Sequence, residues 1–433
     1  MSTSEHDRPS LFEAFGIELE YMIVDRTSLD VRPIADALIT AACGTPESEI
    51  ERPGGISWSN ELVNHVLELK VTDPAPRLDG LPQRFQAGAA EINDLLGPMH
   101  ARLMPGAMHP WMDPRTQTVL WPHEYSRVYG TFDRLFDCRR HGWANLQSVH
   151  LNLPFKGDAE FGRLHAAVRL VLPILPALCA SSPFIDGRAT GLLDNRLEVY
   201  ASNQAKTPSL TGRVIPEPVF TQADYQRVVL DPIARDVRRL DPSGVMQPEW
   251  MNSRGAIARF DRGTIEIRVM DVQECPRADI AIVAAVVAVL MWLVAEEPCP
   301  LAAQQSFGVE PLRAIFDACV RGADEAVITN HAYLAALGHR SAGTSSSARC
   351  AAGELWAGLI ERAGIQPGGD SLLGPVEHIL KRGPLSRRIL TALGDPQRSA
   401  QDEYTPDRRR LHAVYAELCT CLQTGTLLGQ TPR

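Results

Sequence analysis

The first residues of the chain that could do chemistry are two glutamates inside an apolar segment. Glu18 and Glu20 lie within AFGIELEYMIVD, residues 14–25, and their immediate neighbours are aliphatic or aromatic. Alternate side chains of a β-strand point to the same face, so both carboxylates would share one face and the apolar side chains the other. Two neighbouring like charges are unfavourable without a positive partner. The pair therefore indicates either a structural cation or a catalytic one.

Two later segments show the same alternation. SVHLNLPF puts His150 and Asn152 on one face of a strand, and TIEIRVM does the same for Glu266 and Arg268. Any one of these pairs is also typical of the solvated face of an antiparallel sheet. Their repetition in several apolar strands favours a sheet that has one face on a hydrophobic core and lines a polar cavity with the other.

Two more carboxylates, Glu61 and Glu68, occur in SNELVNHVLELKV and are seven residues apart. An odd separation would put them on opposite faces of an uninterrupted strand. If both are to reach the cavity, a bulge or turn must lie between them, near Asn64.

Clustered carboxylates suggest a metal. Mg²⁺ and Mn²⁺ prefer oxygen ligands, and Mg²⁺ is commonly held by a few carboxylates together with substrate phosphates. An arginine on the same face can bind a phosphate through two hydrogen bonds. These residue types indicate phosphoryl transfer from a nucleotide. The positive partner of Glu18 and Glu20 is then expected to be two or more Mg²⁺ ions with nucleotide phosphates, and not a lysine.

Nucleotide-binding loops of the common kinds do not occur. The sequence has no G-x-x-x-x-G-K-[ST] loop, no G-x-G-x-x-G loop and no kinase signature. Metals and side chains would therefore have to hold the nucleotide.

The elements that must position these residues follow from hydrophobic periodicity. Strands are predicted over 14–25, 55–60, 63–71, 147–153, 256–261 and 264–271, and helices over 33–43, 78–97 and 158–180. Pro173 and Pro176 should interrupt the third helix, and Asp-Arg-Gly before residue 264 predicts a hairpin turn. From residue 277 onward the pattern is mostly helical. Strands mixed with helices, followed by a helical tail, indicate an α+β fold on an antiparallel sheet.

Two segments have the composition of loops. Residues 183–220 are rich in Gly, Pro, Asn and Ser and predict a long loop, and SAGTSSSARC, residues 341–350, is typical of a flexible one. Residues 280–295 are strongly apolar but slightly short for a bilayer and end at Glu296 and Glu297, which predicts a buried helix.

Bulk composition excludes several function classes. The 433 residues are 45% hydrophobic and 22% charged, as in globular proteins. The formal charge of −9 disfavours a nucleic-acid binder and a protein held on anionic lipid. Nine scattered cysteines without a C-x-x-C pair, and a polar N-terminus without the apolar core of a signal peptide, are typical of a cytoplasmic protein with reduced thiols.

Several of these motifs resemble one known family. FGIELEYMIVD resembles the opening G-x-E-x-E strand of the glutamate–cysteine ligase superfamily, which includes the bacterial carboxylate–amine ligases and the type 2 glutamate–cysteine ligases. ASSPFIDGRATGLLDNR, residues 180–196, is similar to a loop of the carboxylate–amine ligase branch, and SVHLNLPF and GTIEIRVMD resemble two later strands. Each motif alone is weak, whereas their order over roughly residues 12–295 is fairly specific.

The resemblance implies a fold and a site. The fold would be glutamine-synthetase-like: an antiparallel β-sheet funnel packed with helices in a catalytic domain, residues 12–298, preceded by a flexible N-terminus, 1–11, and followed by a mostly helical C-terminal region, 299–433, packed on that domain. ATP and Mg²⁺ (or Mn²⁺) would be the cofactors. The implied metal ligands are Glu18, Glu20, Glu61, Glu68, His150 and Glu266. Arg268 would bind phosphate, Glu266 and Arg196 would act near the substrate, and Asn152, Arg259 and Arg213 are further candidates for nucleotide or carboxylate contacts.

The implied activity is that of an ATP-dependent carboxylate–amine ligase. Glutamate is the favoured acid, activated as an acyl phosphate and attacked by an amine such as cysteine. The segment LEVYASNQAKTPSLTGRVIPEP, residues 197–220, departs from the branches of the family, so the amine stays open. Two alternatives remain: a catalytically silent relative that binds a nucleotide or an amino acid and acts through a partner, and a kinase that stops at the phosphorylated product. The expected partners are small molecules, with no nucleic acid or membrane, and a homo-oligomer is possible.

Overall fold

The structure is a computed structural model that describes residues 8–339, 349–364, 371–394 and 402–430. Most of the predicted flexible loop at 341–350 and the first seven residues of the predicted flexible N-terminus lie outside these ranges. Arg8, the first described residue, donates hydrogen bonds to the carbonyl oxygens of Phe260 and Asp261. The start of the described chain is therefore fastened beside the hairpin at residues 256–271.

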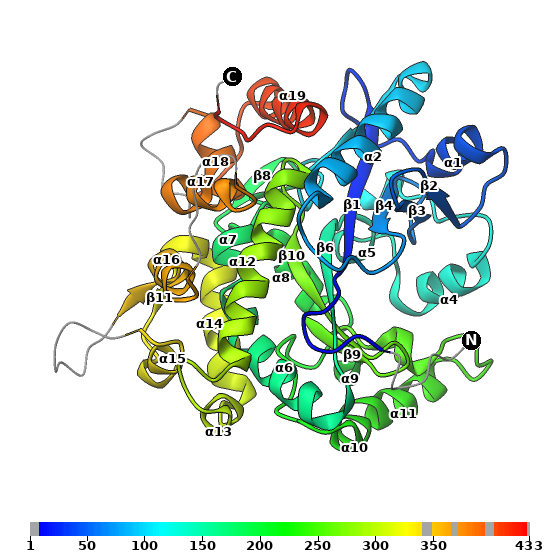
Figure 1. The fold of residues 1–433 in the computed structure, drawn as a ribbon. Helices are drawn as coiled ribbons and strands as arrows, with labels where there is room; N and C mark the ends of the chain where they lie inside the picture. Colours follow the sequence, from blue (N-terminus) through cyan, green and yellow to red (C-terminus); the bar gives the residue numbers. More distant parts are fainter. Residues whose placement is uncertain (1–7, 340–348, 365–370, 395–401, 431–433) are drawn as a thin grey trace.

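The centre of the fold is an eight-stranded sheet (Figure 1). Its order is β2-β3-β4-β1-β6-β10-β9, and β5 pairs with the second half of β1. All of these pairs are antiparallel, so the predicted α+β fold on an antiparallel sheet is confirmed. The strands are β1 (Gly16–Asp25), β2 (Glu49–Arg52), β3 (Ile56–Asn60), β4 (Val66–Val71), β5 (Ala101–Met104), β6 (Ser148–Pro154), β9 (Ala256–Arg259) and β10 (Thr264–Asp271).

One face of the sheet is covered by three helices, α2 (Leu81–Leu96), α6 (Gly157–Val171) and α12 (Pro276–Val294). The apolar side chains of β1, among them the fully buried Ile17, Leu19 and Tyr21, pack into the same core as these helices. In α2 the core positions are Phe85, Ala89, Ile92 and Leu96, the spacing of one helix face. Figure 1 shows α2 and α12 lying across the sheet.

Pro173 and Pro176 interrupt the predicted helix at 158–180, as the sequence predicts. The helix α6 ends at Val171, passes through a 3₁₀ turn (Leu172–Ile174) and restarts as α7 (Pro176–Cys179). Each proline lacks an N–H and fixes φ, so each begins a new short turn.

Helix α12 is, among the described residues, the one helix that is long and apolar enough to cross a membrane. It packs between α2, α6 and α17 (Gly374–Arg382), and 72% of its most apolar stretch is buried inside the protein. The buried helix predicted at this position is confirmed.

The chain after α12 is mostly helical and lies beside α12 and α2 (Figure 1). Its remaining helices are α13 (Leu301–Gln305), α14 (Val309–Gly322), α15 (His331–Ala336), α16 (Ala352–Arg362), α18 (Leu385–Ala392) and α19 (Arg408–Thr424). Side chains from both sides of residue 298, such as Leu290 and Leu312, share one apolar core. A buried ion pair of Arg388 on α18 with Glu274 adds a polar link between the two parts.

The predicted long loop at residues 183–220 is wrong in large part. The segment holds a small sheet, β7 (Phe184–Ile185) and β8 (Arg188–Thr190), and two helices, α8 (Asn195–Ser202) and α9 (Pro208–Thr211). The side chain of Asp194 caps α8 by accepting from the N–H of Leu197 at 2.9 Å. The strand β13 (Glu403–Tyr404) pairs with β8. More than two hundred residues of sequence separate the two strands, so no local pattern predicts this pairing.

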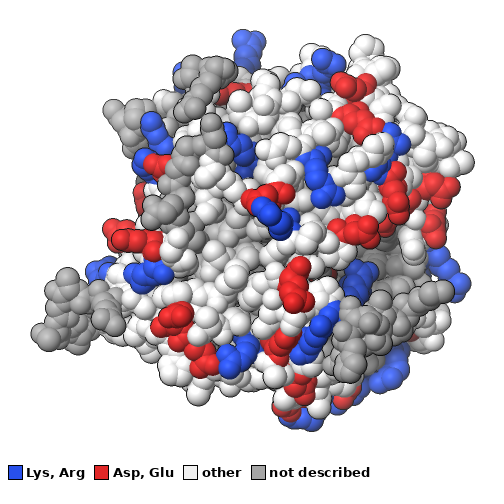
Figure 2. Space-filling view, in the orientation of Figure 1, with Lys and Arg blue, Asp and Glu red and all other residues white. Residues whose placement is uncertain are grey.

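The opposite face of the sheet is partly covered by shorter elements. These are α4 (Ser126–Phe136), α5 (His141–Ala144), α8 and the 3₁₀ turn η5 (Pro248–Met251). On the side of the molecule shown in Figure 2, Lys and Arg are interspersed with Asp and Glu.

Candidate active site

The polar residues of the strands meet on one face of the sheet. Glu18 is directly opposite Lys70 on β4 and opposite His150 on β6. Glu20 is opposite Glu68 in the same ladder. On the far side of β6, Asn152 pairs with Glu266. Residues that are directly opposite in an antiparallel ladder point to the same face, so the predicted polar face is confirmed.

Glu18 and His150 form a close pair at the centre of this face. The Nδ1 atom of His150 lies 2.7 Å from Oε2 of Glu18, and Nδ2 of Asn152 donates to Oε1 of Glu18 at 3.2 Å. Burial alone would raise the pKa of Glu18, but the hydrogen bond and charge of His150 hold it at about 2. Burial alone would lower the pKa of His150, but Glu18 and the charge of Glu20 raise it to about 9. In this state the pair is ionised on both sides at neutral pH.

Ser148 holds the second carboxylate of β1. Its N–H donates to Oε2 of Glu20 at 2.6 Å, and its hydroxyl donates to the same oxygen at 2.8 Å. Glu20 itself is 8% exposed. The glutamate is therefore fixed in position through one oxygen, and its Oε1 lies 3.9 Å from Nε2 of His150.

Glu61 and Glu68 approach Glu20 from the neighbouring strands. A turn after β3 separates them, as the odd spacing requires, and Asn64 lies in that turn. Burial and the charge of Glu20 raise the pKa of Glu61 to about 7. Burial and the charges of Glu18 and Glu61 raise the pKa of Glu68. The cluster thus carries more negative charge than its own cations balance.

These residues fit a divalent cation. Glu18, Glu68 and His150 each offer a ligand atom, and these atoms lie within 4.8 Å of one another; the same holds for Glu20, Glu61 and Glu68. The donor set of carboxylate oxygens with one imidazole nitrogen suits Mg²⁺ or Mn²⁺. Glu68 belongs to both groups, so it would bridge two neighbouring sites.

A lysine that the sequence analysis does not name also lies on the polar face and pairs with Glu68 and Glu49. The Nζ atom of Lys70 lies 3.6 Å from Oε1 of Glu68 and 2.7 Å from Oε2 of Glu49. Lys70 is two residues after Glu68 on β4, so the period of the strand puts both on the polar face. Lys70 and His150 therefore supply positive charge within the cluster, as Arg268 does from β10.

The arginines fall into two groups. Arg268 has its Nε 2.9 Å from Oε1 of Glu266, and although burial opposes it, that carboxylate raises the pKa of the guanidinium. Arg259 lies 3.9 Å from Oε2 of the same glutamate. Arg196 is buried, donates to Oδ1 of Asp271 at 3.1 Å and lines the same cavity as Arg268. Arg213, by contrast, is exposed and paired with Glu310 at 3.0 Å, away from the polar face.

A cavity of about 260 Å³ opens onto the carboxylates. Its floor includes Glu20, Glu61, His150 and Arg268, and its walls come from α4, α5, α8 and η5. The remaining lining residues are Leu62, Tyr129, Phe132, Gly142, Trp143, Leu146, Ser148, Arg196, Tyr200, Asn203, Gln204, Trp250 and Ser253. Asn152, Glu266, Arg259 and Glu18 are on the same face of the sheet but do not line this cavity.

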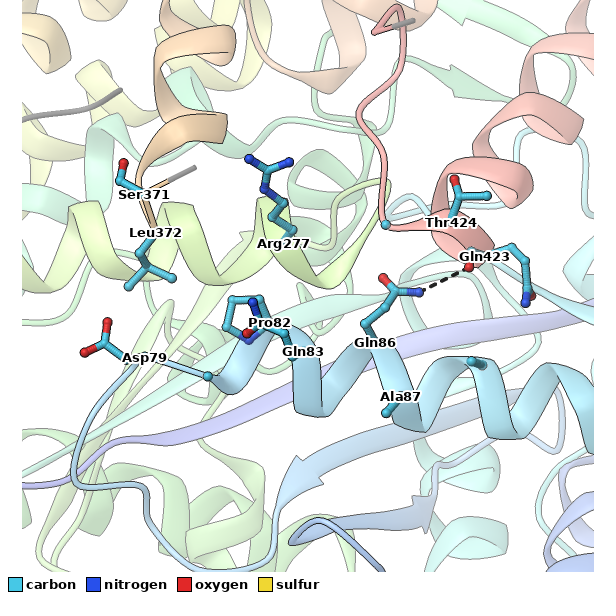
Figure 3. Close-up of a pocket in the computed structure, with 13 residues that line it drawn as sticks. Asp79, Pro82, Gln83, Gln86, Ala87, Arg277, Ser371, Leu372, Gln423 and Thr424 are labelled. Atoms are coloured by element: carbon cyan, nitrogen blue, oxygen red, sulfur yellow. Dashed lines mark hydrogen bonds between the residues drawn. The ribbon is translucent and has the colours of Figure 1, made fainter. Parts of the chain in front are cut away.

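A larger cavity, about 660 Å³, lies on the helical side of the molecule between α2, the start of α12 and α19 (Figure 3). Arg277 points into it, and the side chain of Gln86 reaches the carbonyl oxygen of Gln423 at 3.4 Å. Among the described residues that line it, Asp79 and Arg277 are the charged ones, and none is a carboxylate of the polar face. The candidate active site is therefore the smaller cavity, where the titratable groups converge.

Several residues of the site escape the sequence reasoning. Ser148, Ser59 and Lys70 share the strand parity of His150 and Glu68, so the period of two could have found them. Ser59 donates to Oε1 of Glu68 at 2.8 Å. The aromatic residues of α4, α5 and η5 carry no such signal, because only the tertiary fold brings those elements over the sheet.

The fold and the site define a class. An antiparallel sheet of an α+β protein presents a buried cluster of carboxylates, a histidine and an arginine on its open face, and these residue types could hold a divalent cation. The model of the glutamate-cysteine ligase family 2 matches residues 14–406. The chain belongs to that family of ligases.

Relatives in sequence agree with this assignment. A protein of Archaeoglobus fulgidus, of uncharacterized function, is 36% identical over 275 residues, which are 64% of this chain and 73% of that protein. A protein of Enterobacter sp., whose name as a glutamate–cysteine ligase 2 is provisional, is 26% identical over 65% of this chain and 68% of its own length. A similarly named protein of Bradyrhizobium sp. is 27% identical over 62% of this chain and 59% of its own length.

Two solved structures share the fold. The bifunctional glutathione synthetase of Pasteurella multocida superposes with a TM-score of 0.62 at 11% identity, over 96% of this chain and 53% of that one. The chain thus spans about half the length of the Pasteurella protein. The glutamate–cysteine ligase of Francisella tularensis, solved in complex with AMP, gives a TM-score of 0.53 at 13% identity over 97% and 95% of the two chains. At these identities the likeness shows the fold.

Proposed function

We propose that this protein is an ATP- and divalent-metal-dependent carboxylate–amine ligase that acts on the γ-carboxylate of glutamate. The observation that carries the proposal is the pair of three-residue groups that share Glu68, set on the same sheet face as Arg268. Cations held by these groups, with a fixed guanidinium next to a cavity of about 260 Å³, would suit a reaction between a nucleotide and an amino acid. The Francisella relative in complex with AMP adds support for a nucleotide substrate.

The residues that would hold the metals are those of the two groups, Glu18, Glu20, Glu61, Glu68 and His150, with Glu266 nearby on β10. Bound there, divalent cations would offset the negative charge of the nucleotide phosphates. Ser148 and Ser59 fix the carboxylates that they contact, so the ligands are held before substrate arrives.

The reaction has two steps. An oxygen of the substrate carboxylate attacks the γ-phosphorus of ATP, the bond from that phosphorus to the bridging oxygen breaks, and ADP leaves with the electron pair. The amine nitrogen then forms a bond to the acyl carbon, the carbon–oxygen bond to phosphate breaks, phosphate leaves, and the amine proton passes to solvent. Arg268, held by Glu266, supplies a fixed positive charge beside the transferring phosphoryl group.

The test is ADP release by the purified protein with ATP, Mg²⁺, glutamate and pooled amines that include cysteine. We expect release that needs all four components and is lost in Glu266→Gln while the circular dichroism spectrum is unchanged. Ligand binding in calorimetry with no ADP formed across the pool would instead indicate a silent relative. Hydroxylamine trapping of an acyl phosphate with no amine product by mass spectrometry would indicate a kinase.

A further inference from the structure

Five aromatic side chains form one side of the candidate cavity, and we call them the aromatic wall. They are Tyr129 and Phe132 on α4, Trp143 on α5, Tyr200 on α8 and Trp250 on η5. All five are partly accessible, and Trp250 is 48% exposed. Aromatic surface left open inside a cavity, next to charged groups, is typical of a ligand-binding surface.

The wall is anchored from behind. The rings of Phe132 and Trp143 are 5.5 Å apart, and Trp143 stacks on the buried Phe136 at 5.6 Å. The Nε1 atom of Trp143 is buried and has no hydrogen-bond partner among the described residues. On the other side, Tyr129 accepts a hydrogen bond from Asn60 at 3.1 Å, which ties α4 to the end of β3 beside Glu61. The wall is therefore preformed, with its open faces toward the cavity.

The cavity that the wall lines reaches the Ser148 end of the polar face, and the outer candidates for nucleotide contacts lie at the other end; Tyr200 lies beside Arg268, between the two ends. Ser148, which lines the cavity, is the first residue of β6, whereas Asn152 and Pro154 lie further along that strand. Arg259 is level with Thr264, which pairs with Pro154. At a rise of about 3.3 Å per residue, Arg259 is about 20 Å along the sheet from Ser148. Arg268 lines the cavity and contacts Glu266, so it lies between the two ends.

This arrangement suggests that different substrates bind at the two ends of the polar face. A nucleotide whose phosphates are held near Arg259, Glu266 and Arg268 would leave the walled end for the acid and the amine. Glutamate carries charged groups at both ends of a short chain, which an aromatic surface does not satisfy. Arg196 and Arg268 at the floor suit its carboxylates instead. The substrate that remains for the aromatic wall is the amine.

We propose that the amine acceptor carries an aromatic or bulky apolar group that packs on the aromatic wall, and that cysteine is a poor acceptor. The inference rests on the proposed function and names the substrate class of that same site. A thiol as small as that of cysteine would leave most of the wall in contact with water, whereas a phenyl or long alkyl group would cover it.

The experiment measures kcat/KM for ADP release with ATP, Mg²⁺ and glutamate held fixed and the amine varied. The amines are ethylamine, hexylamine, phenethylamine and cysteine. We expect kcat/KM for phenethylamine and hexylamine to exceed that for ethylamine and cysteine at least tenfold. In Trp250→Ala and Tyr129→Leu, which remove partly exposed rings, the KM of phenethylamine should rise at least fivefold. Met291→Ala, on an exposed apolar side chain of α12 outside the cavity, is the control and should match wild type.

Each outcome has one reading. Equal or better turnover with cysteine would overturn the inference and leave the proposed function standing. A rise in the KM of ATP, with that of phenethylamine unchanged, would show that the wall holds the base of the nucleotide and would likewise overturn the inference. No ADP release with any amine, while calorimetry shows that ATP binds, would overturn the proposed function and the inference together.

Discussion

Glu18 on β1 and His150 on β6 face each other, with Oε2 and Nδ1 2.7 Å apart, and this ion pair lies at the centre of the candidate site. His150 links Glu18 to Ser148, whose hydroxyl lies 3.0 Å from Nε2 of the imidazole and also donates to Glu20. The two carboxylates of the opening strand are thus connected through one histidine and one serine. Their positions are set by β1 and β6, which are hydrogen-bonded neighbours in the middle of the sheet.

Glu68 should matter more for metal binding than any other carboxylate of the cluster, because it belongs to both three-residue groups. We expect Glu68→Gln to weaken Mn²⁺ binding at least tenfold, and Glu61→Gln to weaken it less. Titration calorimetry with MnCl₂ measures both affinities. Glu51→Gln, an exposed glutamate on β2, is the control, and an equal loss in that variant would contradict the assignment.

Arg268 should be needed for turnover, and a lysine at this position should not restore full activity. Its planar guanidinium contacts Glu266 and lines the cavity at once, whereas an ammonium offers one compact charge. We expect Arg268→Ala to lower kcat about 100-fold or more, and Arg268→Lys to recover only part of it. Steady-state ADP release measures the effect. Arg213→Ala, which removes an arginine paired with Glu310 at the surface, should be silent.

The buried pair of Arg388 and Glu274 should stabilise the contact between the C-terminal helices and the rest of the protein. Their side chains are 5% and 0% exposed, and Arg388→Ala would leave the charge of Glu274 buried without its partner. The expected cost is about 3–5 kcal/mol in the free energy of unfolding. Lys381→Ala removes the exposed pair with Glu377 on the neighbouring helix and should cost only about 0.3–0.5 kcal/mol. Urea unfolding compares the two, and similar losses would count against the buried pair.

Three buried histidines should make the fold sensitive to acid. Burial lowers the pKa of His65 and His109 to about 4 and that of His165 to about 3, from the usual histidine value of 6.5. Because the folded pKa is depressed, the stabilisation is present above about pH 6.5 and is lost as pH falls toward the folded value. At about pH 5 each of these histidines should lower the free energy of unfolding by about 2 kcal/mol relative to about pH 7.

Urea unfolding at about pH 7 and about pH 5 tests this acid sensitivity. Buried carboxyls with raised pKa act in the opposite direction, so a variant is needed to isolate the histidines. His165→Gln, which removes the ring that bonds the carbonyl oxygen of Val219, should shrink the difference between the two pH values. His331→Gln changes an exposed ring and should leave it as in wild type. An unchanged difference in His165→Gln would refute the assignment.

The strand period alone was enough to place most of the polar face. Glu18 with Glu20, His150 with Asn152, and Glu266 with Arg268 share faces because side chains of a strand alternate with a period of two, whatever the sheet around them. The same period predicts the turn between Glu61 and Glu68, and it also puts Lys70 and Ser148 on this face, although neither residue type is unusual in a strand.

Local sequence patterns do not predict the structure of residues 183–220 or the partners of the arginines. The composition of that segment is typical of a loop, yet β8 is held by β13 and α8 by a cap, and the first of these contacts joins distant parts of the chain. Arg213 and Arg196 look alike in sequence. Only the fold pairs one with Glu310 at the surface and the other with Asp271 under the cavity.

The sequence by itself determined the antiparallel α+β sheet, the buried helix at 280–295 and the side of each strand that carries charge, because these depend on periodicity within single elements. The tertiary structure alone decided which strands are neighbours, and hence that Glu68 meets both Glu18 and Glu20 and that an aromatic wall stands over them. Those contacts join segments tens to hundreds of residues apart, and their geometry is set by packing against a common core and not by any local preference.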